Sequence, residues 1–361
     1  MTNFEKWDYE FRQQNMFSFN HDANALLWLK VRAVCRGRLI RDFCRSMGIK
    51  LVSTTLRAQN EELFNILENE AAYLPLLDDF LCNKSNEWYE QMGIDEVQLK
   101  EDLYKVKTYL WGGDKNNSLD KHLVSRYVKV ISDYSKLQLA QAEIANNAWN
   151  YVQTSWYNNW TSYLIESLFK HHSRVISAVG EIKSVDFFID DIPVDLKVTF
   201  FPNQYLNEKM KLKLGMGELA WLKREAKKVP VTVDGNQTVS QQLYTITERL
   251  KEMNRYDILD ELISYRKEVI DEAKTNPLEL MEWLYSNQGE MRFGAENRLF
   301  VILADSNDMA DSWKMKRAFN IIEPIVKQYL DAFSASTMKQ VCFTFNQKQY
   351  KSLSDTIFVI K

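Results

Sequence analysis

Residues 173–202 constrain the fold most, because their pattern differs from that of the chain on either side. The segment reads SRVISAVGEIKSVDFFIDDIPVDLKVTFFP, is rich in β-branched and aromatic residues, and changes to a period of two. A period of two with this composition predicts β-strands. We interpret Val185–Ile189 as one strand, residues 190–193 as a turn and residues 194–200 as the returning strand of a hairpin.

The chain before residue 145 has a helical pattern. Only 11 glycines and 6 prolines occur among 361 residues, which favours long helices over an all-β fold. Residues 61–81 and 123–149 repeat apolar side chains at intervals of three and four. Residues 111–122 have the composition of a loop, and Ser118 is the expected N-cap of the helix that follows. We expect a helical N-terminal domain over residues 1–148.

From residue 149 onward, helical and strand-like segments alternate. We expect an aromatic-rich helix at about residues 151–171, the hairpin, and a helical insertion at about residues 205–296 with a loop at 227–240. The apolar run NRLFVILAD predicts a short buried strand, an amphipathic helix follows at about residues 311–333, and KQVCFTF and DTIFVIK predict two more strands. This order predicts an α/β fold, with a mixed sheet flanked by helices in a domain of residues 149–361.

Charge is distributed unevenly, although the net charge is only −3. Residues 28–57 contain eight basic side chains and one acidic one, whereas residues 61–102 contain twelve acidic and two basic ones. These segments either complement each other within the fold or expose a basic surface to a phosphate backbone. The four cysteines and four histidines show no paired or zinc-site spacing, and no stretch approaches the ~20 apolar residues of a membrane helix. We therefore expect a cytoplasmic protein that does not insert into a membrane.

The hairpin carries a group of charges that strands seldom contain. Because side chains alternate along a strand, Asp195 and Lys197 share a face, and closing the hairpin brings Asp186 toward them. Two carboxylates suit Mg²⁺, and the backbone carbonyl of Leu196 is placed to add another oxygen. Lys197 is then the candidate for orienting an attacking water and stabilising charge on a phosphorane-like transition state. The alternative is a solvated hairpin face without a ligand.

An acid two residues before a lysine is a common pattern, and the chain contains four such triplets. Two of them lie in helical sequence, where side chains at positions i and i+2 diverge. The triplet Glu181-Ile-Lys183 lies in strand-like sequence but lacks a second acid on a preceding strand. Only Asp195-Leu-Lys197 has such an acid, which is Asp186.

Asp186, followed across a hairpin by Asp195-Leu-Lys197, resembles the PD-(D/E)XK nuclease superfamily and its type II restriction endonuclease-like members. Val185 stands where that family usually has a proline. The resemblance covers roughly residues 151–201 and 298–305, and it implies a restriction-endonuclease-like sheet core. It also implies an acid on the helix before the sheet, which makes Glu166 a candidate metal ligand or water-orienting acid. On that helix we expect the buried stripe to consist of Trp156, Trp160, Leu164 and Leu168.

The resemblance implies a Mg²⁺-dependent endonuclease, with Mn²⁺ as a possible substitute. The expected partners are double-stranded DNA, a second copy of the chain in a homodimer and, for a restriction system, a separately encoded methyltransferase. The sequence has no Gly-Lys-[Ser/Thr] phosphate loop for a built-in translocase and no glycine-rich cofactor fingerprint for a fused methyltransferase. A repair or structure-specific nuclease, a nuclease acting on RNA, and a non-catalytic DNA-binding or assembly module are the alternatives.

Two further segments allow more than one interpretation. Lys209, Lys211 and Lys213 follow the returning strand, where they either line a nucleic-acid groove or form a solvated helix face. The aromatic segment NYVQTSWYNNWTSY is expected to pack Trp156 and Trp160 in the core, and stacking on exposed bases is the alternative.

Overall fold

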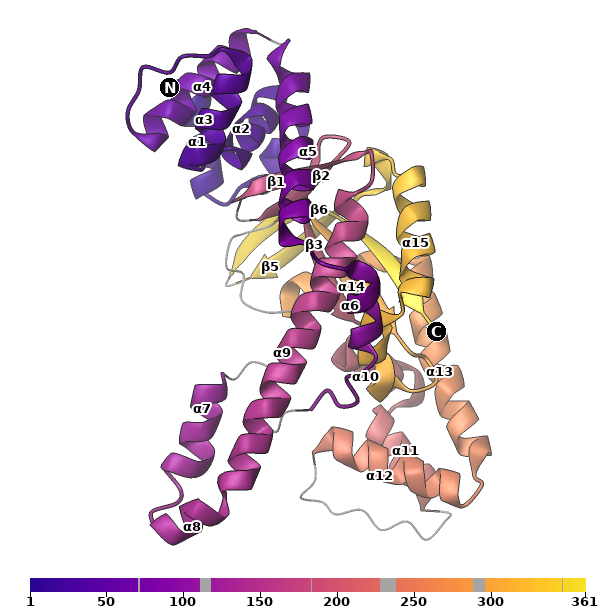
Figure 1. The fold of residues 1–361 in the computed structure, drawn as a ribbon. Helices are drawn as coiled ribbons and strands as arrows, with labels where there is room; N and C mark the ends of the chain where they lie inside the picture. Colours follow the sequence, from indigo (N-terminus) through magenta and orange to yellow (C-terminus); the bar gives the residue numbers. More distant parts are fainter. Residues whose placement is uncertain (71, 111–117, 183, 228–237, 288–295, 346) are drawn as a thin grey trace.

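A mixed six-stranded β-sheet forms the centre of the molecule, and helices lie against both of its faces (Figure 1). The computed structural model describes residues 1–361 except residues 71, 111–117, 183, 228–237, 288–295 and 346. Along the sheet the order is β1-β2-β3-β4-β6-β5, made of β1 (Val175–Ile182), β2 (Val185–Ile189), β3 (Ile192–Phe200), β4 (Arg298–Ala304), β5 (Lys339–Phe345) and β6 (Lys348–Ile360). β1, β2 and β3 are antiparallel neighbours, β4 and β6 run parallel to β3, and β5 is antiparallel to β6. The expected mixed α/β class is confirmed.

All described secondary structure before β1 is helical, as the apolar spacing predicts. In chain order it consists of α1 (Asn3–Arg12), η1 (Met16–His21), α2 (Ala23–Ala33), α3 (Gly37–Met47), α4 (Leu56–Asn69), α5 (Tyr73–Met92), α6 (Glu96–Leu103), α7 (Leu119–Leu123), the π-helix η2 (Val124–Val128), α8 (Tyr134–Leu139) and α9 (Gln141–Lys170). Ser118 caps α7 by accepting a hydrogen bond from the Lys121 N–H. The stretch 123–149 is not one helix, because Asp133 starts a new one by accepting hydrogen bonds from Ser135 N and Lys136 N.

The expected insertion between β3 and β4 is helical. It consists of α10 (Asn203–Leu214), α11 (Glu218–Ala226), α12 (Val239–Glu252), α13 (Tyr256–Thr275) and α14 (Pro277–Asn287). Most of the loop expected at residues 227–240 lies outside the described residues. The amphipathic segment after β4 divides into a 3₁₀ helix, η3 (Met309–Arg317), and α15 (Phe319–Ala332), and a short η4 (Ala335–Thr337) precedes β5. None of the described helices combines the length and the apolar character needed to cross a bilayer.

The hairpin turn is tighter than the sequence suggests. Ile189 pairs with Ile192, so only Asp190 and Asp191 form the connection, with φ values of 44° and 69°. Positive φ at both central residues is what a two-residue type I′ turn requires, and Asp tolerates it better than most residues. The expected four-residue turn at 190–193 is therefore wrong, and Pro193 lies inside β3 opposite Phe188.

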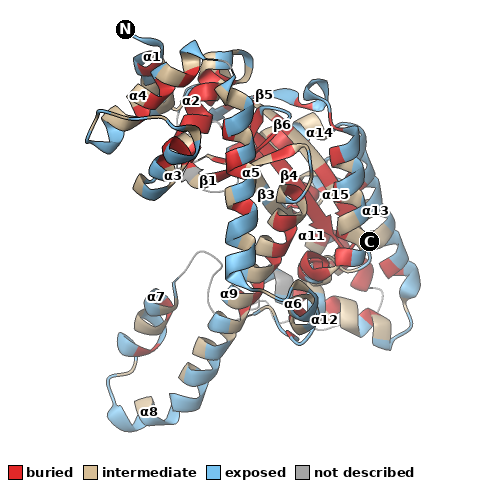
Figure 2. Cartoon of the chain, turned by 45° about the horizontal axis from the view of Figure 1, so that its top comes forward, coloured by how far each residue is buried: buried red, intermediate tan, exposed pale blue. Residues whose placement is uncertain are grey.

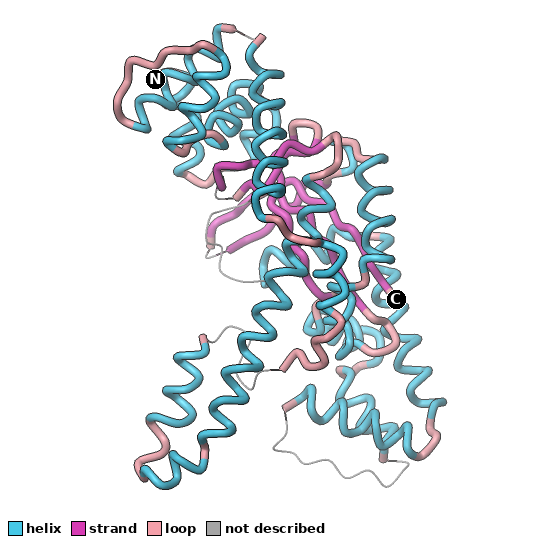
Figure 3. The backbone as a smooth tube through the Cα atoms, viewed as in Figure 1, coloured by secondary structure: helices cyan, strands magenta, loops and turns pink. Residues whose placement is uncertain are grey.

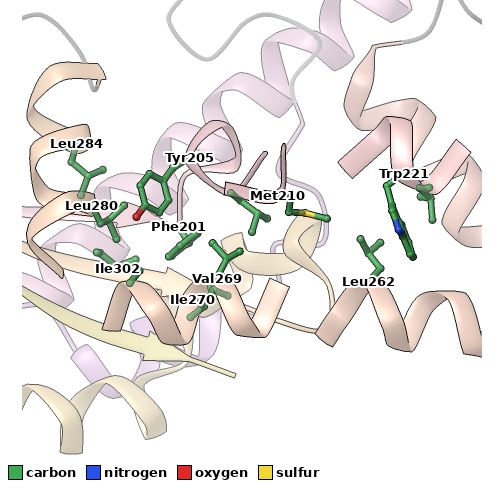
Figure 4. Close-up of a cluster of buried hydrophobic side chains, with 14 of the residues drawn as sticks. Phe201, Tyr205, Met210, Trp221, Leu262, Val269, Ile270, Leu280, Leu284 and Ile302 are labelled. Carbon is green, nitrogen blue, oxygen red and sulfur yellow. The ribbon is translucent and has the colours of Figure 1, made fainter. Parts of the chain in front are cut away.

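The two faces of the sheet bury different hydrophobic clusters. Alternate residues of β4 divide between them, with Leu299, Val301 and Leu303 on one face and Phe300, Ile302 and Ala304 on the other. α9 and α15 cover the first face. The insertion helices cover the second face over β4, β6 and β5, where Phe201, Tyr205, Val269 and Leu280 pack around Ile302 (Figure 4).

The N-terminal helices cover the β1–β2 end of the sheet. Their cluster includes Ala178, Ile182, Val185 and Phe188, so helices α1 to α5 share one core with the first two strands. Contact is close at Gly180, where an added Cβ would lie 2.2 Å from the Ala33 carbonyl oxygen. The boundary expected after residue 148 falls within the continuous helix α9. Figure 3 shows the strands enclosed between these helical groups.

A buried lysine connects the N-terminal helices to the hairpin. Lys30 on α2 is fully buried, and its Nζ lies 2.8 Å from Asp191 Oδ1 in the turn and 2.8 Å from Asp78 Oδ1 on α5. An ammonium group taken out of water is tolerated only when anionic groups accept its hydrogen bonds. The position of the turn is therefore set by contacts with segments more than a hundred residues away in sequence.

Asn297 connects three separate segments at the start of β4. Its Nδ2 donates to the Pro193 carbonyl at 3.0 Å and to Asn20 Oδ1, and its Oδ1 accepts from the Leu353 N–H at 3.1 Å. The side chain is almost completely buried. It therefore satisfies a buried main-chain carbonyl of β3 and a part-buried N–H of β6.

We expect Asn297→Ala to lower the free energy of unfolding by about 2–4 kcal/mol, because it leaves the Pro193 carbonyl and the Leu353 N–H unpaired. Urea unfolding followed by circular dichroism measures the change. The control is Asn287→Ala on α14, whose exposed amide bonds only within its own helix, with an expected change within about 0.5 kcal/mol. Equal effects of the two substitutions would contradict this role for Asn297.

Candidate active site

Strand β3 changes its neighbour at Asp195. Residues 192–194 pair with β2, whereas Asp195 and the residues after it pair with β4. The Asp195 N–H donates to the Asn297 carbonyl at 2.8 Å, so the main-chain groups of Asp195 face β4. Because successive residues of a strand point their main-chain groups toward opposite edges, those of Leu196 face the side that β2 has left.

Asp186 provides the partner that Leu196 would otherwise lack. Asp186 Oδ2 accepts a hydrogen bond from the Leu196 N–H at 2.8 Å. Extending the hairpin register by one residue from the pair Phe187–Val194 places Asp186 opposite Asp195, so their side chains leave the same face of the sheet. The Leu196 carbonyl lies on the same edge of β3 as its N–H, which is the edge that Asp186 occupies.

Asp195 lies between two cationic side chains. Lys197 Nζ donates to Asp195 Oδ1 at 3.1 Å, and about half of the Lys197 side chain (49%) is exposed. Arg298, the β4 residue in register with Asp195, places its Nε 3.4 Å from Asp195 Oδ2. Asp195 is buried, and within the described part of the chain its Oδ2 accepts no hydrogen bond.

Burial within this group raises the pKa of Asp186 to about 6. Burial is the largest cause of the higher pKa, and the negative charges of Asp195 and Glu166 act in the same direction. The Leu196 N–H and the Lys197 ammonium oppose this rise in pKa. The hairpin thus brings Asp186, Asp195 and Lys197 into one electrostatic group, and Glu166 contributes to it from α9.

Glu166 lies at the side of this group rather than at its centre. It is half-buried on α9, and its Oε1 pairs with Lys170 Nζ at 2.5 Å one turn later. The stripe expected on this helix is confirmed in part: Leu164 is fully buried, and Trp156, Trp160 and Leu168 are half-buried and pack against the same cluster. The buried side chains of α9 are Thr154, Tyr157, Thr161, Leu164, Ile165, Ser167 and Phe169.

Glu296 belongs to the same charge group, and the sequence reasoning missed it. It is buried just before β4 and pairs with Arg298 at 2.8 Å. Burial raises its pKa, and the charge of Asp195 adds to the rise, whereas Arg298 and Lys197 oppose it. A signal was present in the sequence, since Glu296 and Arg298 are charged residues at the entrance of an otherwise apolar buried strand.

The three lysines of α10 are not part of this group. Lys209 pairs with Glu279, and Lys213 pairs with Glu272 at 2.6 Å and Glu268 at 3.3 Å. Lys211 is exposed. Two of the three lysines thus connect α10 to α13 and α14, as the solvated-face interpretation allows, and their contact with nucleic acid stays a prediction.

The donor set at the hairpin fits a hard divalent cation. Asp186 and Asp195 offer carboxylate oxygens, one of which is buried without a hydrogen bond, and a cation beside them would relieve the repulsion that raises the pKa of Asp186. Among the described residues, no group of three or more His, Cys, Asp or Glu side chains is arranged to hold a metal ion. Mg²⁺ needs fewer protein ligands, because it binds through one or two carboxylates together with waters and substrate phosphate oxygens.

Comparisons of this chain with protein-family models, with curated proteins and with solved structures found no match. The interpretation of the site therefore depends on its own geometry and charge.

We expect Asp186→Asn to raise the thermal midpoint at pH 8 in the presence of EDTA, by the equivalent of about 1–3 kcal/mol. Asn can still accept the Leu196 hydrogen bond, but it removes a buried negative charge beside Asp195. Because the pKa of Asp186 is raised in the folded state, the stability of the wild type that depends on its protonation is lost as the pH rises from about 4 to about 6. The difference in thermal midpoint between Asp186→Asn and the wild type should therefore become smaller as the pH is lowered through that window.

Differential scanning fluorimetry between pH 4 and pH 8 measures this difference. The control is Asp260→Asn, at an exposed carboxylate on α13, with an unchanged midpoint expected. A second readout is the addition of Mg²⁺ or Mn²⁺, which should raise the midpoint of the wild type more than that of Asp186→Asn. A variant that is less stable than the wild type at pH 8 without metal would contradict the unfavourable burial of the Asp186 charge beside Asp195.

Proposed function

We propose that this protein is a Mg²⁺-dependent endonuclease that hydrolyses phosphodiester bonds of double-stranded DNA. The observation that carries the proposal is the position of Asp186 opposite Asp195, where β2 and β3 separate, with Lys197 bonded to the second carboxylate. The order of elements also supports it. α9, the antiparallel strands β1, β2 and β3, and the parallel strand β4 follow one another as the resemblance to the PD-(D/E)XK superfamily implies.

Asp186 and Asp195 are the residues that would hold the ion, with the Leu196 carbonyl on the same edge and Glu166 nearby. Bound there, Mg²⁺ would supply a Lewis acid and a water of lowered pKa. At pH 7 to 8 the pKa of about 6 leaves the Asp186 carboxylate mostly ionised, as a metal ligand must be. The repulsion from Asp195 that raises this pKa also favours binding of a cation over two unpaired negative charges.

Lys197 is the proposed catalytic residue. Its ammonium group is half-exposed and bonded to Asp195 Oδ1, so it can exchange that bond for a contact with a phosphate oxygen or an attacking water. A fixed ammonium beside the scissile phosphate would stabilise the negative charge that develops on the phosphate oxygens. Arg298 remains on the other oxygen of Asp195 and holds the carboxylate in place when Lys197 moves.

As the biological role we propose a type II restriction enzyme with a separately encoded methyltransferase. The hairpin site provides one active centre per chain. Cutting both strands of a duplex then requires either two copies or two successive nicking events.

We expect Lys197→Ala to reduce cleavage of duplex DNA with Mg²⁺ at least about 100-fold, because it removes the charge that stabilises the transition state. Binding of DNA should stay within about threefold of the wild type, because one exposed lysine contributes little to affinity. Gel electrophoresis measures cleavage and fluorescence anisotropy measures binding. The control is Lys267→Ala on α13, an exposed lysine of the same kind, with unchanged cleavage expected.

The substrate panel should contain several unmodified bacterial and phage DNAs, together with structured RNA of similar length. Cleavage of RNA but not of DNA would contradict the proposed substrate, but it would agree with the proposed active site. If DNA and RNA both stay intact with Mg²⁺ and with Mn²⁺, the result would contradict the proposed nuclease activity and favour a non-catalytic binding module.

A further inference from the structure

The first half of α9 forms an arm that projects from the body of the molecule together with α7 and α8 (Figure 1). One side of this arm is occupied by η2. Glu143 Oε1 accepts hydrogen bonds from Arg126 and from the Tyr127 hydroxyl, and the same hydroxyl accepts one from Asn147 Nδ2 at 2.7 Å. Most of the remaining surface of the arm is exposed or half-buried (Figure 2).

The opposite side of the arm carries an apolar stripe. Ala142, Ala145, Trp149 and Val152 are all exposed, with 62% of Trp149 and 53% of Val152 accessible to solvent. Their spacing of three, four and three residues is that of the a and d positions in a helix that packs against another helix. These four residues form the apolar stripe of α9.

The stripe does not continue the most deeply buried face of α9. The buried face of the second half passes through Thr154, Tyr157 and Thr161. Followed backward at 3.6 residues per turn, that face reaches Asn147 and Glu143, which contact η2. In the arm, the stripe therefore lies on the side of the helix away from η2. Toward the body, the next positions on the same side, Trp156 and Trp160, are half-buried and pack against the core cluster, so the exposed part of the stripe ends at Val152.

The chemistry of the stripe favours a partner that is also apolar and uncharged. The sequence contains no charged residue from Ile144 to Ile165. Two copies of this helix can approach each other without repulsion between like charges. The stripe itself carries no charge, so it requires no opposite charge on a partner. A large exposed tryptophan in such a stripe is typical of the centre of an interface.

We infer that the stripe is the contact between two copies of this chain, which pair their α9 arms antiparallel about a two-fold axis at the level of Asn147. In that register Trp149 of each copy faces Ala145 of the other, and Val152 faces Ala142. Each large side chain meets a small one, and the same pairs recur on both sides of the axis. A two-fold interface requires this self-complementarity.

The inference does not depend on the proposed function. The arm is short, since about 15 residues of helix extend roughly 22 Å. An interface of that length is smaller than a standard one, so we expect a dissociation constant in the micromolar range, on the order of 1–50 µM.

Sedimentation velocity of the full chain, from about 1 to 100 µM, tests the dimer. We expect a monomer–dimer equilibrium that Trp149→Glu weakens at least about tenfold, with an unchanged far-UV circular dichroism spectrum. The control is Tyr244→Glu on α12, where the tyrosine is 64% exposed and lies outside the stripe, with no change expected. A wild-type chain that stays monomeric at 100 µM would overturn the inference, whether the stripe is left uncovered or is covered by another molecule. So would an equal effect of the two variants.

A charge-pair experiment tests the register. Ala145→Lys and Trp149→Glu should each weaken the dimer, but in the double variant the two new charges face each other across the axis. We expect the double variant to dimerise at least about threefold more tightly than Trp149→Glu alone, and to lose this gain in 1 M salt. If the double variant is no tighter than Trp149→Glu, the antiparallel register is wrong. Val152→Glu provides an independent test of the stripe should either lysine or glutamate variant fold poorly.

Discussion

The hydrogen bond from the Leu196 N–H to Asp186 Oδ2 is the interaction on which the candidate site depends. β3 leaves β2 after Val194 to pair with β4, and this change leaves main-chain groups at the edge of β3 without a strand partner. A carboxylate is a strong acceptor for such an N–H. By making this bond, Asp186 allows the two strands to separate, and it holds its own negative charge opposite Asp195. The same contact thus stabilises the fold and concentrates charge at one point.

Two helical groups cover the sheet on either side of Asp186 and Asp195. Because they stop short of these residues, the candidate site stays accessible. The N-terminal cluster covers β1 and β2, and the insertion cluster covers β4, β6 and β5, while the row of Asp195 and Lys197 belongs to neither cluster. Lys30 fixes the tip of the hairpin from one side, and Asn297 fixes the start of β3 from the other. The charges of this polar row are compensated in two ways, because the buried Asp195 lies against the buried Arg298, whereas solvent reaches Lys197.

The sequence predicts the parts of the site that depend on neighbouring residues. Alternation along two short strands is enough to place Asp186, Asp195 and Lys197 on one face, because the hairpin brings together residues only about ten positions apart. Arg298 and Glu296 could not be placed in this way, since the pairing of β3 with β4 joins residues about a hundred positions apart, across an entire helical insertion. Of the four residues expected to form the buried side of α9, only Leu164 is fully buried, whereas Trp156, Trp160 and Leu168 pack against the core and stay half-buried. Apolar and aromatic residues occur on more than one side of that helix, so their spacing alone does not indicate which side is buried.

α9 connects the two proposed surfaces and sets the distance between them. Glu166 lies 19 residues after Asn147, which corresponds to roughly 28 Å along the helix, so antiparallel arms would place the two Glu166 side chains roughly 57 Å apart. That separation equals about 17 base pairs of duplex at 3.4 Å per step. Two active sites at this distance cannot act on opposite strands at one position. A dimer through the arms would therefore hold two separate cleavage positions, on one duplex or on two, and cutting both strands at one position would need sequential nicking or a different contact between copies.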